Sequence, residues 1–280
     1  MPVHLVTFGG LRVIDDARRF ERLLAQRSRA ALLIYLTIER RVSREALTAM
    51  FWPESDSENA RHALRQSLYH IRKAIGGHEW IESRIHELLV RGDIVSDAGA
   101  FGDAVECGDM ECALRLYHGA FLQGVHLVDS TAWESWVDAR RSRYARLFRR
   151  ACRDLLDAKL AARDFHGAIA VAERWTEPDP TDDEAQHRLI AALADAGERA
   201  EAIRQYETYA RLLAPEGLEP LDETRDLVER LRAERQRTAR PRPVARRATS
   251  RPNASLRPLL SRPSWDGTSR VEDRSSPLYP

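Results

Sequence analysis

One segment of the chain, residues 58–75 (ENARHALRQSLYHIRKAI), combines an apolar stripe with a face of basic and amide side chains. Ala60, Leu64 and Ile71 recur at intervals of three to four residues and multiples of them, which predicts an amphipathic helix whose stripe packs on a core. The opposite face and its edges carry groups that can hydrogen-bond to phosphate oxygens or to base edges. These residues are Arg61, His62, Arg65, Gln66, Tyr69, Arg72 and Lys73. The first hypothesis for this face is contact with double-stranded DNA.

A solvated cationic helix face is the alternative hypothesis. Ordinary surface helices mix acids and bases on their outer face as i,i+4 pairs. The outer face of residues 58–75 has no acid beyond its first turn, where Glu58 forms a capping-box pattern with Ser55. The charges alone do not separate the two hypotheses, so the neighbouring elements must.

The segments before this helix predict the first part of a helix-turn-helix. Residues 3–14 contain two short β-branched runs around Gly9-Gly10, which predicts an opening hairpin. Residues 27–39 are apolar with helical spacing, and Ser43 offers an N-cap for a helix over 44–52. A short polar connection then leads into the helix at 58–75, so the two helices fit a helix-turn-helix.

The segments after this helix predict a wing. Gly76-Gly77 ends the helix, and residues 80–83 and 87–97 have the composition of strands, with a turn at 91–93. Order and spacing therefore favour a winged helix-turn-helix whose second helix reads the duplex. Further side chains at helix starts or in the wing could contact phosphate or the minor groove, although solvation explains each equally well. They are Arg27, Arg29, Arg44, Arg84, His86 and Arg91.

Residues from about 101 to 235 have a helical pattern with an internal repeat. Capping-box patterns at 131–134 and 181–184 predict helix starts. Ala168-Ile169 and Ala202-Ile203 lie 34 residues apart. A period of 34 residues is typical of tetratricopeptide (TPR) helix pairs, which stack because one pair cannot bury its apolar face alone. A third, degenerate pair is expected near 103–122.

Composition and motifs argue against several classes of function. There is no phosphate-binding glycine loop and no catalytic constellation, so we expect no enzyme and no cofactor. Cys107 and Cys112 have no second Cys or His pair at zinc spacing, so we expect no metal. Three cysteines, no long apolar run and no secretory pattern favour a cytoplasmic protein that does not enter a membrane.

The charge of the chain is divided between three segments. The net charge is +1, but residues 1–96 carry 15 basic and 12 acidic residues, and residues 231–280 carry 12 arginines and 4 acids. The segment between them is therefore acidic. Residues 236–280 are rich in Arg, Pro and Ser without apolar periodicity, so we expect a disordered basic tail.

The run SREALTAMFWPESDSENARHALRQSLYHIRKAIG resembles the winged helix of SARP-type bacterial transcriptional activators, which is related to the OmpR-like winged helix. LRLYHGAFLQGV, WESWVDARRSRYARLFRRACRDLL and the region through DPTDDEA to GLEP look like the bacterial transcriptional activator domain (BTAD) that follows it. The resemblance covers about residues 3–232. It implies an activator that binds direct repeats near a promoter, as two protomers side by side or a homodimer, and that helps to recruit RNA polymerase.

These observations predict a mainly α protein. We expect a winged helix-turn-helix DNA-binding domain (1–97), a TPR-like BTAD (98–235) and a disordered tail (236–280). The expected function is transcription regulation through the recognition helix 58–75, with double-stranded DNA and RNA polymerase as partners. The alternative is a TPR-type interaction adaptor in which the winged helix is only structural.

Overall fold

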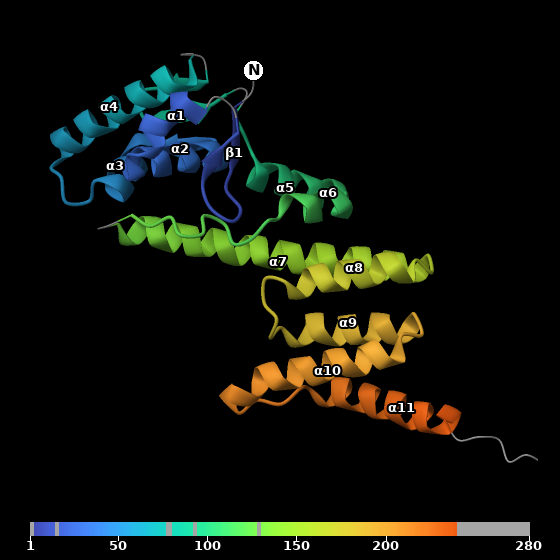
Figure 1. Ribbon diagram of the computed structural model, residues 1–280. Coiled ribbons are helices and arrows are strands. Elements are labelled where there is room, and N and C mark those ends of the chain that lie inside the picture. The colour runs from blue at the N-terminus through green and yellow to red at the C-terminus, as the bar shows by residue number, and fades with distance from the viewer. Residues whose placement is uncertain (1–2, 15–16, 77–79, 92–93, 128–129, 240–280) are drawn as a thin grey trace, which may run out of the picture. The chain divides into compact units, whose positions relative to one another are not determined.

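The computed structural model describes residues 3–14, 17–76, 80–91, 94–127 and 130–239 (Figure 1). The described residues fall within one compact unit, Met1–Ala239. Most of the predicted tail, residues 240–280, lies outside the described residues. So do Gly77, at the predicted end of the recognition helix, and residues 92–93 of the predicted turn in the wing.

The first sheet joins the two ends of the N-terminal region. Its strand order is β2-β1-β6, with β1 at Val3–Val6, β2 at Arg12–Val13 and β6 at Ile94–Ser96. The predicted opening hairpin is confirmed, because β1 and β2 pair antiparallel. The assignment of residues 94–97 to the wing was wrong, because β6 pairs parallel with β1, with Val3 opposite Ile94.

The second sheet contains the wing. Its order is β3-β5-β4, with β3 at Arg41–Ser43, β4 at Ile81–Ser83 and β5 at Glu87–Val90. The hairpin of β4 and β5 closes through residues 84–86, with Ile81 opposite Val90. The wing turn was therefore predicted too late in the sequence, since the chain after β5 leaves this sheet to join β1.

Four helices fill the space between the sheets, one more than predicted. They are α1 (Ala17–Leu24), α2 (Arg27–Glu39), α3 (Arg44–Phe51) and α4 (Ser57–Ile75). Most of α2 is buried, as expected of a helix that is apolar on nearly every side. It packs against α1 and α4, and α4 also packs against α1 and α3. The helices α3 and α4 form the predicted helix-turn-helix.

Helix caps explain where these helices begin. Ser43 Oγ accepts the Ala46 N–H at 3.0 Å, as predicted. At α4 the predicted capping box was wrong, because Asp56 is the N-cap and its carboxylate accepts the N–H groups of Glu58 and Asn59. Gly76 ends α4 with φ of 83°, a left-handed conformation that glycine adopts without steric cost.

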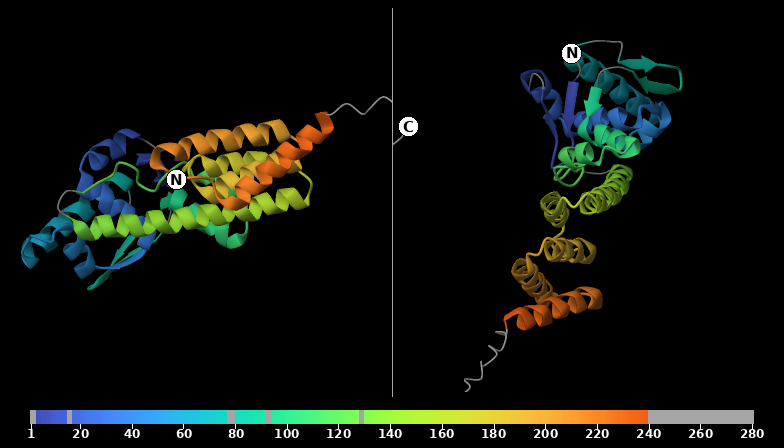
Figure 2. Two further views of the ribbon diagram at one scale, coloured as in Figure 1. Left: turned by 90° about the horizontal axis from the view of Figure 1, so that it is seen from below. Right: turned by 90° about the vertical axis from the view of Figure 1, so that its right-hand side faces the viewer.

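The rest of the described chain is a series of helices in which each packs against the next (Figure 2). Trp175 and Tyr209 occupy equivalent buried places in the two repeats, and Ala168 and Ala202 do the same. The predicted stacking of helix pairs, and with it the mainly α fold class, is confirmed. The elements are α5 (Asp97–Cys107), α6 (Met110–Leu116), α7 (Thr131–Ala161), α8 (Phe165–Thr176), α9 (Asp183–Asp195), α10 (Arg199–Leu213), the 3-10 turn Ala214–Glu216 and α11 (Asp222–Ala239).

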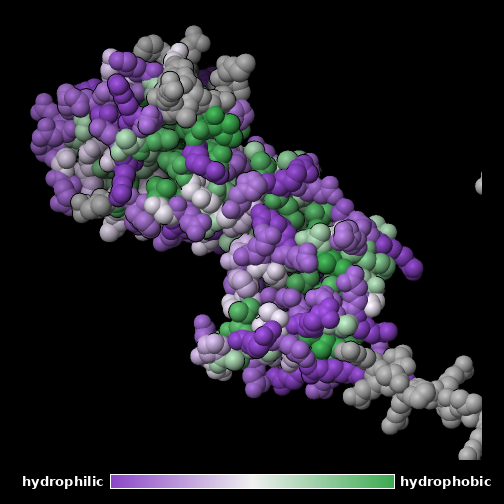
Figure 3. Space-filling model, viewed as in Figure 1, coloured by the Kyte–Doolittle hydropathy of each residue, from purple (hydrophilic) through white to green (hydrophobic). Residues whose placement is uncertain are grey.

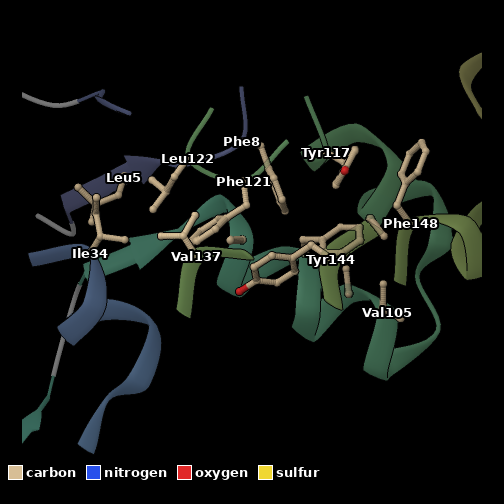
Figure 4. Packing of buried hydrophobic residues seen from close by; sticks show 14 of the residues in the cluster. Leu5, Phe8, Ile34, Val105, Tyr117, Phe121, Leu122, Val137, Tyr144 and Phe148 are labelled. Carbon is tan, nitrogen blue, oxygen red and sulfur yellow. The ribbon is translucent and has the colours of Figure 1, made fainter. Parts of the chain in front are cut away.

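One aromatic cluster connects the N-terminal sheet to the helices after it (Figure 4). Phe8 is fully buried, and its ring contacts the rings of Phe101, Tyr117, Phe121 and Tyr144 at centroid distances of 4.7 to 6.4 Å. The backbone pairs at the same place, where the Leu122 N–H donates to Thr7 O at 2.7 Å. The core is therefore continuous across residue 97.

A second contact joins α7 to the helix-turn-helix. Trp133 is fully buried against Phe51 of α3. Trp136 Nε1 donates to Glu39 Oε1 at 2.6 Å, and Arg140 forms an ion pair with the same carboxylate at the end of α2. Among the helices that the structure describes, none has the length and apolar character needed to cross a bilayer.

Candidate nucleic-acid interface

The structure places the polar face of α4 on the outside. Ala60, Leu64, Leu68 and Ile71 are buried, whereas the side chains one third to one half of a helical turn away are exposed. Arg61, His62, Arg65, Gln66, Tyr69 and Lys73 are all exposed, and Tyr69 is 58% exposed despite its large ring. In Figure 3, hydrophilic residues dominate the surface at the upper left, where Figure 1 places α3 and α4.

The cations of α4 have no acidic partner among the residues that the structure describes. Arg61, Arg65, Arg72 and Lys73 form no ion pair with any residue that the structure describes. On α7, by contrast, six of the eight basic residues are in ion pairs. Surface ion pairs form readily wherever acids are within reach. The face of α4 therefore keeps its positive charge available for an external anion.

A groove, the wing-side groove, runs between α3, α4 and the wing formed by β4 and β5. It has a volume of about 1120 Å³, and five arginines line it, together with Glu45 and His86. Burial, and then the like charges of Arg72 and Arg65, lower the pKa of Arg44. The arginines in the groove carry like charges at close range, and an anion bound there would relieve their repulsion. The arginines are Arg44, Arg61, Arg65, Arg72 and Arg84.

Arg72 connects α4 to the wing rather than projecting outward. Its side chain is half-buried, and Nη2 donates to Ser83 Oγ at 2.6 Å and to Ile81 O at 3.3 Å. Its Nε is buried without a hydrogen-bond partner among the described residues, which leaves one donor of the groove unsatisfied.

The predicted wing residues differ in their surroundings. Arg84 forms ion pairs with Glu82 and Glu87, and Arg91 forms one with Glu82 at 2.6 Å. Their positive charge is therefore largely compensated. His86 is exposed, and Arg44 Nε donates to Arg84 O, which holds the turn of the wing beside α3. At the tip, between Arg84 and His86, the apolar side chain of Ile85 is 85% exposed.

The remaining predicted residues lie on the other side of α4. Arg27 is exposed at the first position of α2 and lines neither the groove beside the wing nor the groove beside α1. Arg29 and Lys73 line a second groove together with Arg22 and His70. Sequence patterns missed Arg22 because α1 was not predicted. They could have found His70, since it lies three residues before Lys73 and so shares its flank of the helix.

Among the described residues, no cluster of three or more His, Cys, Asp or Glu side chains could hold a metal ion. Their three cysteines are free, and burial raises the pKa of Cys152 to about 12, which makes its thiol unreactive.

The fold and the cationic helix define the class: a winged helix-turn-helix followed by stacked helical pairs. The model of the bacterial transcriptional activator domain (BTAD) family matches residues 82–232, so the chain belongs to this family. It is a transcriptional regulator of the SARP type, which confirms the resemblance seen in the sequence. The matched region begins at β4, inside the predicted DNA-binding domain. No curated protein matches the chain.

Comparison with solved structures supports the fold. Mycobacterium tuberculosis EmbR, solved in complex with a low-affinity phosphopeptide, is similar with a TM-score of 0.57 and 21% sequence identity. The similarity covers 83% of this chain and 65% of the EmbR chain, so this chain spans just under two thirds of its length.

Proposed function

We propose that the protein binds double-stranded DNA through α4 and activates transcription from promoters. The observation that carries the proposal is the exposed face of α4, whose cations Arg61, Arg65 and Lys73 have no acidic partner among the described residues. In this arrangement Arg65 and the wing-side groove bind phosphate, and Gln66, His62 and Tyr69 reach into the major groove. Gln is suited to adenine, since its amide can both donate and accept.

The resemblance to SARP-type activators supports the finer parts of the proposal. Two protomers bind side by side on direct repeats near a promoter, either as a homodimer or through contacts made on DNA. The helical pairs support these contacts and help to recruit RNA polymerase. The protein acts in the cytoplasm, as a regulator and without a catalytic activity of its own.

The proposal is tested by removing one cation from the centre of the face. Arg65→Ala should weaken binding to a duplex enriched from a random-sequence library by about 1–3 kcal/mol, or roughly 5- to 150-fold. Fluorescence anisotropy of a labelled duplex measures this, at several salt concentrations. The matched control is Arg230→Ala on α11, which removes an exposed arginine that also has no ion-pair partner in the described part of the chain.

Two results would contradict the proposal. The full chain could bind no duplex even at low salt, where phosphate contacts are strongest. Alternatively, the Arg65→Ala variant could bind the duplex as tightly as the wild type and the Arg230→Ala control do.

A further inference from the structure

A second cationic groove lies on the flank of α4 that faces away from the wing. It has a volume of about 610 Å³, and α1, the start of α2 and the C-terminal half of α4 line it. Arg22, Arg29, Lys73 and His70 are its titratable lining residues, and no acid lines it among the residues that the structure describes. The first three also form no ion pair within those residues. Like the wing-side groove, this surface is suited to an anion.

The two grooves lie on opposite flanks of one helix. At 3.6 residues per turn, each residue advances about 100° around the helix axis. Lys73 and His70 are therefore rotated from Arg65 by roughly 80° and 140° around α4. Tyr69 and His62 are rotated from Arg65 by roughly 40° and 60° and lie between the two sets, so they form a ridge with a cationic groove on each side. Gln66, rotated by roughly 100°, lies beside Lys73 at the edge of this ridge.

This arrangement matches the cross-section of a duplex. The major groove of B-DNA is about 12 Å wide, and a helix with its side chains measures about 10–12 Å across. A helix that fills the groove has one phosphate backbone on each side. We infer that the groove lined by Arg22, Arg29, His70 and Lys73 binds the phosphates of one strand while the wing-side groove binds those of the other.

The inference rests on the proposed function but adds to it. A ligand with one backbone, such as single-stranded nucleic acid, would contact only one flank of α4. Neither the sequence patterns nor the resemblance assigned Arg22 or His70 to any ligand. The inference therefore specifies a duplex, contacted on both strands, as the ligand. Helix α1, which packs against α2 and α4, places Arg22 beside the C-terminal half of α4.

The test is a double substitution in the full chain, Arg22→Ala with Lys73→Ala. Both side chains are exposed, so the fold should tolerate their loss. The probe is a duplex enriched from a random-sequence library, with each strand labelled in turn for phosphate-ethylation interference. Wild-type protein should show interference on both strands. The variant should lose it on one strand, and the slope of log affinity against log salt should become shallower by about 2.

Controls separate this inference from the proposed function. The charge-preserving variant Arg22→Lys with Lys73→Arg should behave as the wild type, and so should Arg230→Ala. If the double alanine variant keeps interference on both strands and the same salt slope, the second groove does not bind phosphate, although DNA binding through Arg65 still stands. If the wild type shows no interference on either strand, the inference and the proposed function both fail.

Discussion

At the scale of single residues, the proposed interface consists of cations that have no acidic partner among the described residues. Arg61, Arg65 and Lys73 are exposed cations that form no ion pair within the described part of the chain. Burial, and then the charges of Arg72 and Arg65, lower the pKa of Arg44. The wing shows the opposite arrangement, because Glu82 and Glu87 compensate Arg84 and Arg91. We therefore expect α4 to supply more of the electrostatic affinity than the wing does.

Asp56 is a residue whose effect depends on pH. The N–H and side-chain amide of Asn59, and then the N–H of Glu58, hold the pKa of its carboxyl below the usual value. A depressed pKa in the folded state means that Asp56 stabilises α4 above its unfolded pKa of about 3.9 and loses this effect as pH falls through its folded pKa. Asp56→Ala should lower the thermal midpoint at pH 7, and the difference from wild type should shrink at acid pH.

The matched variant is Asp56→Asn, which keeps an oxygen that can accept the same N–H groups. Its midpoint at pH 7 should lie above that of Asp56→Ala. Scanning calorimetry of the three proteins across pH gives the comparison. A midpoint for Asp56→Ala that equals the wild type at pH 7 would show that the cap does not stabilise α4.

At the scale of elements, local patterns predicted the recognition helix well. Residues 58–75 carry a strong helical period, and α4 spans Ser57–Ile75. The predicted α2 matches Arg27–Glu39. These signals succeed because helix hydrogen bonds and caps connect residues close in sequence. The short helix α1 lacks the long apolar period that made the others visible.

Strand pairing could not be predicted in the same way. Residues 87–97 have the composition of strands around a predicted turn at 91–93, yet Glu87–Val90 and Ile94–Ser96 belong to different sheets. The parallel pairing of β6 with β1 joins residues about ninety positions apart, and no local pattern encodes it. The ion pair of Arg91 with Glu82 likewise depends on the pairing of β4 with β5, which brings the two residues together across the hairpin.

At the scale of the whole molecule, the buried aromatic cluster spans the predicted domain boundary at residue 97. Phe8 packs against four rings that all come from residues after 97, and Phe51 packs against Trp133. The division into domains 1–97 and 98–235 stays a prediction, but the packing indicates that the two parts stabilise each other. Helix α7 contacts α2 through the hydrogen bond from Trp136 to Glu39, and it contacts α3, the first helix of the helix-turn-helix, through the packing of Trp133 on Phe51.

This packing predicts how a fragment behaves. Residues 1–97 alone would expose Phe8 and Phe51, and each exposed phenylalanine side chain forfeits about 1.5–3 kcal/mol of burial. The fragment should therefore unfold at a lower urea concentration than residues 1–239, as followed by far-UV circular dichroism. A fragment with the same urea midpoint as residues 1–239 would show that the winged helix is independent of the helices after it.

The central claim, that α4 reads a duplex, is tested most directly by base preference. The full chain and its Gln66→Ala variant are used to enrich duplexes from the same random-sequence library, and the enriched sequences are compared. We expect the wild type to enrich a defined motif and the variant to lose preference at one base pair while it keeps the rest. An identical motif for both proteins, or no motif for the wild type, would contradict the claim.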